Sequence, residues 1–358
     1  MPGTLFKLVR TTAFRFSSIS IMFLLLLIVI AYQHLRFISY DVMPKIEQVD
    51  AKTQKLAVNV EVGCHIFNFP EFSFKTPNFL MDAVVWFKIP VASIDLRVIE
   101  QFTIQNSLLQ GWGLLYHSAP IIKIIGNEIL VSYHVQTKFT GEFQYRDFPL
   151  SDHTLHLIIQ NRSVVPEEIC FHAKKENLSF SQRTFHSWSV KNVTATTGFM
   201  GTMLQTDNPN FNMTYPVAIF SIDFNEDGLN NLFSLYFPLF ILFFIALFSL
   251  FFEIDDTQRI ANIISLVPAL VLFKLVINSV APDISYITHI DLLFYALVGL
   301  SLCIMLFQMY AMLVLQQIKT LSSDAQVALK NSLRNKNDIL FIFTLIVLFV
   351  VICWLLVR

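Results

Sequence analysis

Three carboxylates stand close together just before an apolar stretch of helical length. They are Glu253, Asp255 and Asp256 in the sequence E-I-D-D-T-Q-R, which ends at Arg259. Carboxylates at the mouth of a passage through a membrane favour cations over anions. If the apolar stretch lines such a passage, these three residues predict a preference for cations.

The apolar stretch itself carries a stripe of residues at helical spacing, since residues three or four positions apart share a face. Counted from Thr257, the stripe consists of Thr257, Ala261, Ser265, Pro268, Leu272 and Val276, with Leu275 beside it. Small and polar members come first, where water and ions are tolerated, and apolar members follow, where a constriction can dewet and close. We predict that this stripe lines a pore. Packing between helices through small residues is the alternative.

Two residues of this stretch are unusual in a membrane helix. Pro268 removes an intrahelical hydrogen bond and should kink the helix, so we place the constriction at Leu272 and Val276. Lys274 lies off the stripe, and an ionisable residue inside a span is costly and often functional. We expect its ammonium group to reach outward or to pair with a neighbouring helix.

The composition indicates a membrane protein. Of 358 residues, 54% are hydrophobic and only 14% are charged, which is far from the average of soluble proteins. A bilayer core of about 30 Å needs about 20 mostly apolar residues per helix. Five segments are candidates, at about 17–32, 232–252, 260–280, 290–315 and 338–357. The formal net charge of −1 argues against a nucleic-acid partner.

Flanking charge predicts how these helices cross the membrane. Basic residues precede the first segment and fill the linker 316–337, whereas 281–289 has none; they are Lys7, Arg10, Arg15, Lys319, Lys330, Arg334 and Lys336. By the positive-inside rule the N-terminus and the linker 316–337 are cytoplasmic. We interpret residues 1–40 as a cytoplasmic start with a signal-anchor or signal helix, 41–230 as an outer domain and 231–358 as a four-helix domain. The expected location is the plasma (cell inner) membrane, with the outer domain extracellular or periplasmic.

The sequence of the outer domain predicts strands rather than helices. The segments 56–62, 79–88, 154–160, 186–193 and 217–224 alternate in polarity or are β-branched. Turn residues separate them at Asn68-Phe69-Pro70, Gly126-Asn127 and Asn208-Pro209-Asn210. This pattern predicts an antiparallel β-sandwich. Cys64 and Cys170 could form one disulfide, although two cysteines without a spacing pattern are a weak signal. The sequence has no metal-binding cluster, and we expect no cofactor.

Two segments resemble one protein family. The sequence P-D-I-S-Y-I-T-H-I-D (282–291) joins two membrane-length helices. It resembles the link between the second and third transmembrane helices of the pentameric ligand-gated ion channels, the Cys-loop receptor superfamily. The sequence G-E-F-Q-Y-R-D-F-P-L-S-D-H-T-L (141–155) is similar to the signature loop of that family, although Ser151 replaces its usual acid. Gly141 and Leu155 stand where eukaryotic receptors carry the disulfide pair, so the loop looks like that of prokaryotic members.

The resemblance implies a homopentamer in a lipid bilayer, with the helix at 259–279 lining its pore. It also implies permeant inorganic ions and an agonist, which is an unknown small molecule or the proton. Anion channels of the family usually have a Pro-Ala step before the basic residue at the foot of the pore helix, and this chain has none before Arg259. The absence of that step agrees with the cation preference predicted from the carboxylates.

The resemblance further implies how the outer domain would act on the pore. The tip of the signature loop, formed by Phe148, Pro149 and Leu150, would touch Pro282, Asp283 and Tyr286. The family's arginine before the first membrane helix is absent, and we predict instead a reversed pair of Arg146 with Glu226 or Asp227.

The agonist site of the family lies between subunits and is lined by aromatic residues that hold a cation. Phe102, Phe211 and Tyr215 fall near the corresponding loops. His153 and His289 are candidate proton sensors, although a histidine in a loop is usually only solvated.

Two other classes of protein remain open at this stage. One is a non-conducting membrane receptor or sensor, in which an outer β domain is coupled to a helical bundle. The short linker 316–337 argues against an additional inner output domain in such a sensor. The other is a membrane-embedded enzyme. The spans contain no paired carboxylates, histidine cluster or nucleophile motif, so we do not expect an enzyme.

Overall fold

The computed structural model describes residues 11–37, 41–48, 57–91, 95–107, 117–150, 152–185, 188–203, 212–226, 230–254, 256–318 and 322–357. The chain forms two compact units, each with its own hydrophobic core. The helical unit comprises Met1–Phe37, Tyr145–Leu150 and Gly228–Arg358, and the β unit comprises Ile38–Gln144 and Ser151–Asp227. The units divide close to residues 40 and 230, but the loop Tyr145–Leu150 belongs with the helices.

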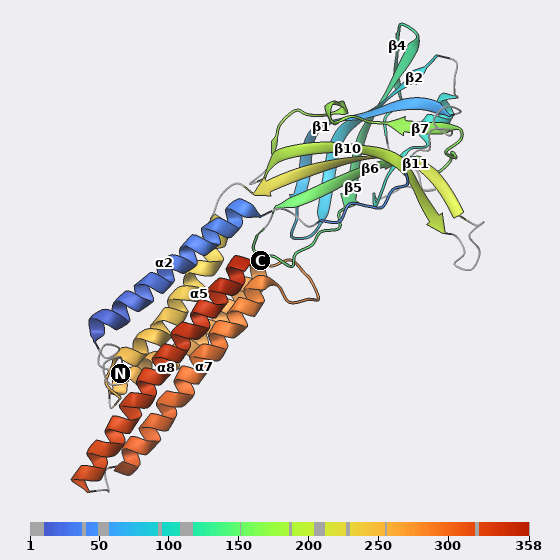
Figure 1. The fold of residues 1–358 in the computed structure, drawn as a ribbon. Coiled ribbons are helices and arrows are strands. Elements are labelled where there is room, and N and C mark those ends of the chain that lie inside the picture. Colours follow the sequence, from blue (N-terminus) through green and yellow to red (C-terminus); the bar gives the residue numbers. More distant parts are fainter. Residues whose placement is uncertain are drawn as a thin grey trace. The chain divides into compact units, whose positions relative to one another are not determined.

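The β unit consists of two sheets (Figure 1). The six-stranded sheet has the order β4-β5-β2-β1-β7, with β8 also paired to β1, and the five-stranded sheet has the order β3-β6-β11-β10-β9. The strands are β1 (Val58–Ser73), β2 (Asn78–Pro90), β3 (Thr103–Ile104), β4 (Ile121–Ile125), β5 (Glu128–Thr140), β6 (His153–Gln160), β7 (Ile169–His172), β8 (Leu178–Phe180), β9 (Thr184–Phe185), β10 (Trp188–Met203) and β11 (Asn212–Glu226). Because β1 runs parallel to β7 and β8, the expectation of a wholly antiparallel sandwich is wrong at those two pairs.

Side-chain alternation explains why these segments form a sandwich. Buried and half-buried residues alternate along β2, as expected where one face of a strand meets a core. Val85 and Phe87 of the six-stranded sheet belong to the same buried cluster as Phe220 and Ile222 of the five-stranded sheet. The two sheets therefore share one core.

Two of the predicted turns have different outcomes. Gly126, with a φ of 64°, lies in the turn between β4 and β5, a conformation that glycine adopts without steric cost. Asn68–Pro70 is not a turn, because it lies within β1 where the register against β2 is irregular. Proline has no N–H for a sheet ladder, so a bulge is one of the places where a strand accepts it. The turn predicted at 208–210 lies outside the described residues.

The cysteines of the β unit do not form the disulfide that their presence allowed. Cys64 and Cys170 are both buried and unpaired. Cys170 lies opposite Asn59 of β1, and Cys64 is five positions further along that strand, or about 16 Å at the rise of a β-strand. A disulfide needs Cα atoms within about 7 Å.

Both thiols should therefore be inert in the folded protein. Burial raises the pKa of Cys64 to about 12 and also raises the pKa of Cys170, so neither is a thiolate at pH 8, and the thiolate is the reactive form. We expect a membrane-impermeant maleimide to label neither residue until the protein is denatured, when it should label both. Labelling of Cys64 before denaturation would contradict this burial.

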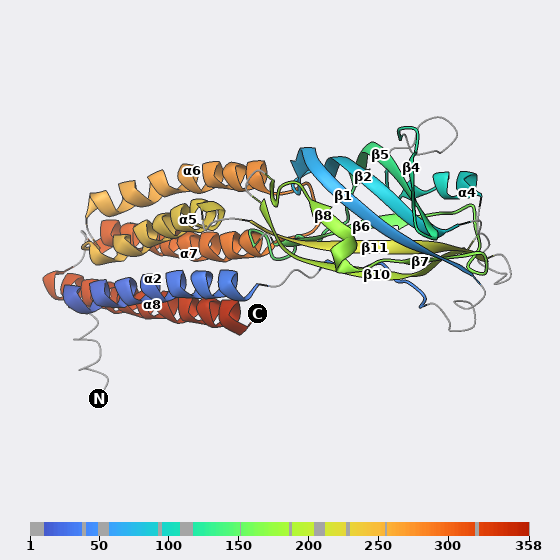
Figure 2. The ribbon, with the colours of Figure 1, turned by 90° about the horizontal axis from the view of Figure 1, so that it is seen from above.

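The described part of the helical unit contains five long helices (Figures 1 and 2). They are α2 (Thr12–Arg36), α5 (Asn230–Phe248), which continues into the 3-10 turn η2 (Ser249–Phe251), α6 (Thr257–Val280), α7 (His289–Ile318) and α8 (Ser323–Val357). Helix α2 lies against α8 and α5, and α7 contacts α5, α6 and α8. Pro238 and Pro268 lie inside α5 and α6 without ending them.

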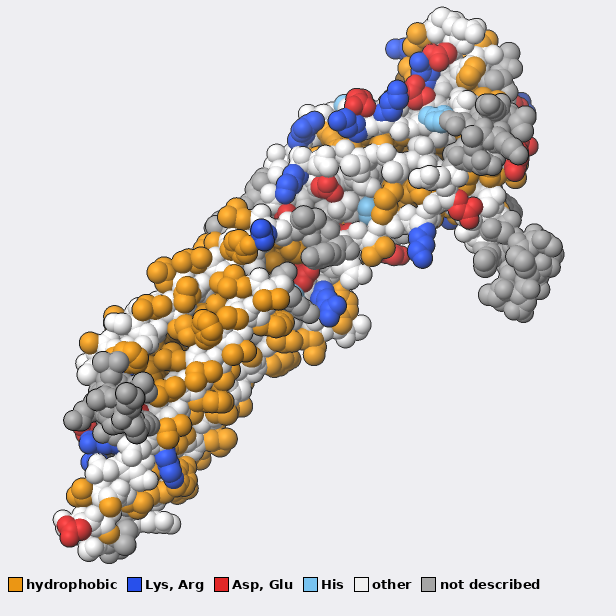
Figure 3. Space-filling view, viewed as in Figure 1, with side chains coloured by type: hydrophobic (Ala, Val, Ile, Leu, Met, Phe, Trp, Pro, Cys, Tyr) orange, Lys and Arg blue, Asp and Glu red, His pale blue; other side chains and the backbone are white. Residues whose placement is uncertain are grey.

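Four of these helices are long and apolar enough to cross a membrane: α2, the part of α5 and η2 at Leu232–Phe251, the part of α7 at His289–Gln317, and α8. In α6 the apolar helix found among the described residues is shorter, Ile264–Val280. Figure 3 shows hydrophobic side chains over most of the visible face of the helical unit, whereas charged side chains gather on the β unit. The apolar helices suggest a membrane-spanning protein.

Helix α8 begins earlier than expected. It starts at Ser323 rather than near residue 338, so much of the predicted linker 316–337 is a polar extension of the last helix. The segment after Ser323 contains neither proline nor glycine and is rich in Ala, Leu, Lys, Arg and Gln, which favour helix. The last helix therefore extends into the segment 316–337, whose cytoplasmic location stays a prediction.

Candidate functional site

The predicted pore stripe lies on the open side of α6. Its described side chains are all exposed in the single chain, namely Ala261, Ser265, Pro268, Leu272, Leu275 and Val276. The other side of the helix faces the core of the helical unit, where Leu266, Leu270, Phe273 and Ile277 are buried. The described stripe residues therefore avoid the buried face of α6, although Ile264 and Val271, which are not on the stripe, are exposed as well. The side chain of Thr257 lies outside the described residues.

Lys274 joins α6 to α7. Its ammonium group forms an ion pair with Asp291 and lies 5.3 Å from the ring centroid of Tyr295. Oδ2 of Asp291 accepts a hydrogen bond from the backbone N–H of Thr288 at 3.2 Å, and the N–H of Asp291 donates to the Thr288 hydroxyl oxygen at 3.4 Å. This reciprocal arrangement is a capping box, so Lys274 pairs with the neighbouring helix at its capped start.

The loop Tyr145–Leu150 caps the first turn of α7. The first N–H groups of a helix have no partner inside it. Here the N–H of His289 donates to the carbonyl of Arg146 at 3.1 Å, and that of Ile290 donates to the carbonyl of Phe148 at 3.3 Å. The side chain of Asp147 completes the contact, with its Oδ1 atom 3.2 Å from Nδ1 of His289.

The start of this loop, rather than its tip, makes the described contact with the connection before α7. The N–H of Tyr145 donates to the hydroxyl of Tyr286 at 2.9 Å, and Phe148 and Leu150 pack against the helical core. The Phe148–Pro149 peptide bond is cis. Of the three linker residues expected here, the structure brings Tyr286 to the loop, while Pro282 is buried and Asp283 is exposed.

A buried polar cluster ties the other ends of the helices together. Arg15 of α2 forms an ion pair with Asp338 of α8 and donates to the carbonyl of Leu250 at 2.8 Å. Arg259, at the start of α6, is fully buried and donates to Oδ1 of Asn337 at 2.5 Å. The cluster thus joins α2, η2, α6 and α8 through charged groups that sequence analysis had placed on flanks.

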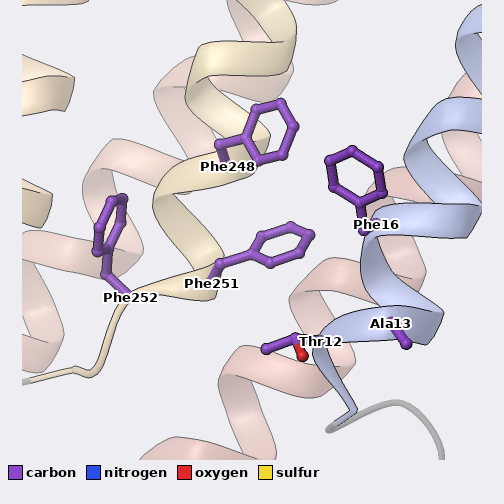
Figure 4. Close-up of a pocket in the computed structure, with 6 residues that line it drawn as sticks. All are labelled: Thr12, Ala13, Phe16, Phe248, Phe251 and Phe252. Atoms are coloured by element: carbon purple, nitrogen blue, oxygen red, sulfur yellow. The ribbon is translucent and has the colours of Figure 1, made fainter.

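An aromatic groove of about 580 Å³ lies beside this cluster (Figure 4). Its lining is Thr12, Ala13 and Phe16 from α2 with Phe248, Phe251 and Phe252 from the end of α5. Figure 4 shows the ring of Phe16 facing the rings of Phe248 and Phe251, and the Arg15 guanidinium lies 5.8 Å from the centroid of Phe251. The groove is apolar and carries no chemistry of its own.

The predicted selectivity carboxylates are only partly described. Glu253 is exposed, and its Oε1 atom lies 3.8 Å from Nη2 of Arg334, a surface pair of the kind that contributes little to stability. Asp256 is half-buried next to the start of α6, and Asp255 lies outside the described residues.

The three predicted ligand-binding aromatics do not form a described site. Phe102 is 1% exposed in the core of the sandwich, where its ring meets Phe87 and Tyr133, so we withdraw it as a ligand contact. Tyr215 is also buried, with the Arg162 guanidinium 5.5 Å from its ring centroid. Phe211, Asp227 and the side chain of Glu226 lie outside the described residues, so the reversed pair with the exposed Arg146 stays a prediction.

His153, the first residue of β6, and His289, the first residue of α7, are not simply solvated. His153 is 5% exposed, with Nδ1 3.1 Å from Oδ2 of Asp41, and its ring stacks on Phe74. His289 contacts Asp147 and the ring of Trp354. Sequence reasoning missed both acid partners. Only Asp147 could have been found from the sequence, because it directly precedes Phe148 and Pro149 of the loop that resembles the family.

A scan against protein-family models and a search of the curated proteins both found no match to this chain. The assignment of function therefore rests on the geometry described above.

Proposed function

We propose that this chain is the subunit of a homopentameric ligand-gated ion channel that conducts cations through a pore lined by α6. The observation that carries the proposal is the capping of α7 by the loop Tyr145–Leu150. This loop joins β5 to β6 along the chain. Through the hydrogen bond from Tyr145 to Tyr286 it also contacts the segment between α6 and α7. A shift of those strands can therefore act on the end of the pore helix.

The face of α6 supports the same proposal. Ser265 and its small neighbours on the stripe are exposed on a helix whose opposite side fills the core. A lipid-facing surface does not need these residues, whereas five copies around an axis would place them along a water-filled passage. Leu272 and Val276 would form apolar rings in the same passage, where a constriction can dewet.

The remaining features of the proposal follow from the sequence. The partners are four further copies of the chain, the lipid bilayer, inorganic cations and an agonist that is a small molecule or the proton. The proposed location is the plasma membrane, with the β unit extracellular or periplasmic and no enzymatic role. Glu253, Asp255 and Asp256 would favour cations at the cytoplasmic mouth.

The test combines the mass of the purified protein in detergent with its current in planar bilayers. We expect a pentamer, and we expect Ser265→Phe to reduce its unitary conductance several-fold by narrowing the pore. Leu302→Phe is the matched control, since Leu302 is exposed on α7 and lies off the proposed pore. A different oligomeric state, or equal effects of the two substitutions, would remove the pore proposal.

A second candidate is a non-conducting membrane receptor with the same assembly. It is favoured by Pro268, which stands on the exposed stripe of α6 where the family's gate usually has a bulky aliphatic residue. A pentamer that stays silent across pH, divalent cations and amines would select this candidate.

A further inference from the structure

A small polar pocket lies in the β unit, and three residues at the start of the segment 141–155 belong to its lining, namely Gly141, Glu142 and Phe143. Its volume is about 240 Å³, below the roughly 300–1,000 Å³ of pockets for drug-sized ligands. Its polar lining includes Lys45, Gln105, Glu142 and His156. The size suits a molecule with only a few non-hydrogen atoms.

One wall of this pocket is the segment before β1, and the structure holds that segment at two points. The Asp41 carboxylate accepts the N–H groups of Gln144 at 2.7 Å and Thr154 at 2.8 Å. Further along, Glu47 and Phe199 exchange backbone hydrogen bonds of 2.8 and 2.9 Å. The wall between these points is therefore pre-organised, and pre-organisation lowers the cost of binding.

Two residues of the lining carry a buried polar atom without a hydrogen-bond partner in the described part of the chain. The atoms are Oε1 of Gln105 and Nε2 of His156. Nδ1 of His156 lies 2.9 Å from the hydroxyl of Ser221, and burial lowers the pKa of this histidine against the opposing charges of Asp41 and Asp223. In the neutral tautomer that accepts from Ser221 at Nδ1, the proton is on Nε2, and the two residues then offer one donor and one acceptor.

Leaving such atoms unpaired is unfavourable, and a ligand that pairs with them removes this cost. Both atoms are covered by neighbouring groups, so a ligand that pairs with them must turn the two side chains. The exposed residues of the lining add one charge of each sign, Lys45 and Glu142. Neither has an ion-pair partner within the part of the chain that the structure describes.

We propose that this pocket binds a small zwitterion, the size of a short amino acid. Its carboxylate lies toward Lys45 and Nε2 of His156. Its ammonium group lies toward Glu142 and Oε1 of Gln105. The inference does not rest on the channel proposal, because it requires only the β unit.

The test is calorimetric titration of the full-length protein in detergent with glycine and β-alanine, using propionate and propylamine as singly charged controls. We expect at least one zwitterion to saturate the protein and both controls to bind at least tenfold more weakly. Lys45→Ala and His156→Phe should each weaken zwitterion binding about tenfold or more. Lys138→Ala is the matched control, because Lys138 pairs with Glu71 outside the pocket, and it should bind as the unsubstituted protein does.

Thermal melting establishes that each variant is folded before it is titrated. Three results would overturn the proposal. The first is that neither zwitterion saturates the protein at millimolar concentration. The second is that a singly charged control binds as tightly as the zwitterion. The third is that folded Lys45→Ala and His156→Phe bind the zwitterion with unchanged affinity. None of these results depends on whether the protein conducts ions.

Discussion

Replacing Asp338 with alanine is expected to destabilise the helical unit by about 3–5 kcal/mol, because it removes the carboxylate that forms an ion pair with a buried arginine. The side chains of Arg15 and Asp338 are only 9% and 3% exposed. Arg259 belongs to the same buried cluster and binds the neighbouring Asn337. Without the carboxylate, two guanidinium groups remain inside an apolar bundle.

The loss of stability in Asp338→Ala should come from the unpaired charge rather than from the missing side-chain contacts. Replacing a whole buried ion pair by apolar residues is often neutral or stabilising, whereas removing one partner is costly. We therefore expect the double variant Arg15→Leu with Asp338→Leu to recover much of the stability lost in Asp338→Ala. Arg15→Leu alone should be as damaging as Asp338→Ala, because it strands the carboxylate instead.

The measurement is unfolding in mixed detergent micelles, followed by size-exclusion chromatography. Asp324→Ala is the matched control, since Asp324 is exposed in the first turn of the same helix. An exposed acid near a helix N-terminus contributes about 0.3–1 kcal/mol through the helix dipole, so this control should change little. If Asp338→Ala and Asp324→Ala unfold alike, the buried ion pair does not hold α2 to α8.

Local periodicity predicted some strands of the fold and missed others, such as β5. The strand segments within 79–88, 154–160 and 217–224 lie inside β2, β6 and β11, because burial on one face imposes a period of two on a strand. Hydropathy likewise located α5 and α7. Neither signal reports which strands pair, so the parallel pairing of β1 with β7 and β8 could not be anticipated.

Side-chain exposure was predictable where a single helix decides the geometry. Helical spacing kept the described stripe residues off the buried face of α6, although Ile264 and Val271 outside the stripe are exposed as well. That the stripe lines a pore stays a prediction. Ion pairs between distant segments were not predictable. Arg15 and Asp338 are separated by 323 positions, and each looked like an ordinary charge at the edge of an apolar run. Asp41, which binds Thr154 and His153, gave no sequence signal either.

Replacing His289 with alanine is expected to lower the opening equilibrium of the proposed channel by roughly 5–150-fold, the usual range of coupling between two sites. His289 places its Nδ1 atom 3.2 Å from Asp147 in the loop that caps α7. Alanine keeps the backbone N–H that donates to Arg146 but removes the side-chain contact. The measurement is the agonist or proton dependence of the macroscopic current, which should shift to higher concentration or disappear.

A matched background distinguishes lost coupling from a damaged pore. Leu272→Ser places a hydroxyl on the exposed stripe of α6, so it should hydrate the constriction and give current without agonist. His289→Ala should leave this constitutive current nearly unchanged, because the pore no longer depends on the loop. Asp147→Ala should act like His289→Ala, and the double variant should be little worse than either, since contacting residues are not additive. If His289→Ala removes the constitutive current as well, its effect lies in assembly or in the pore, and the capped loop does not transmit opening.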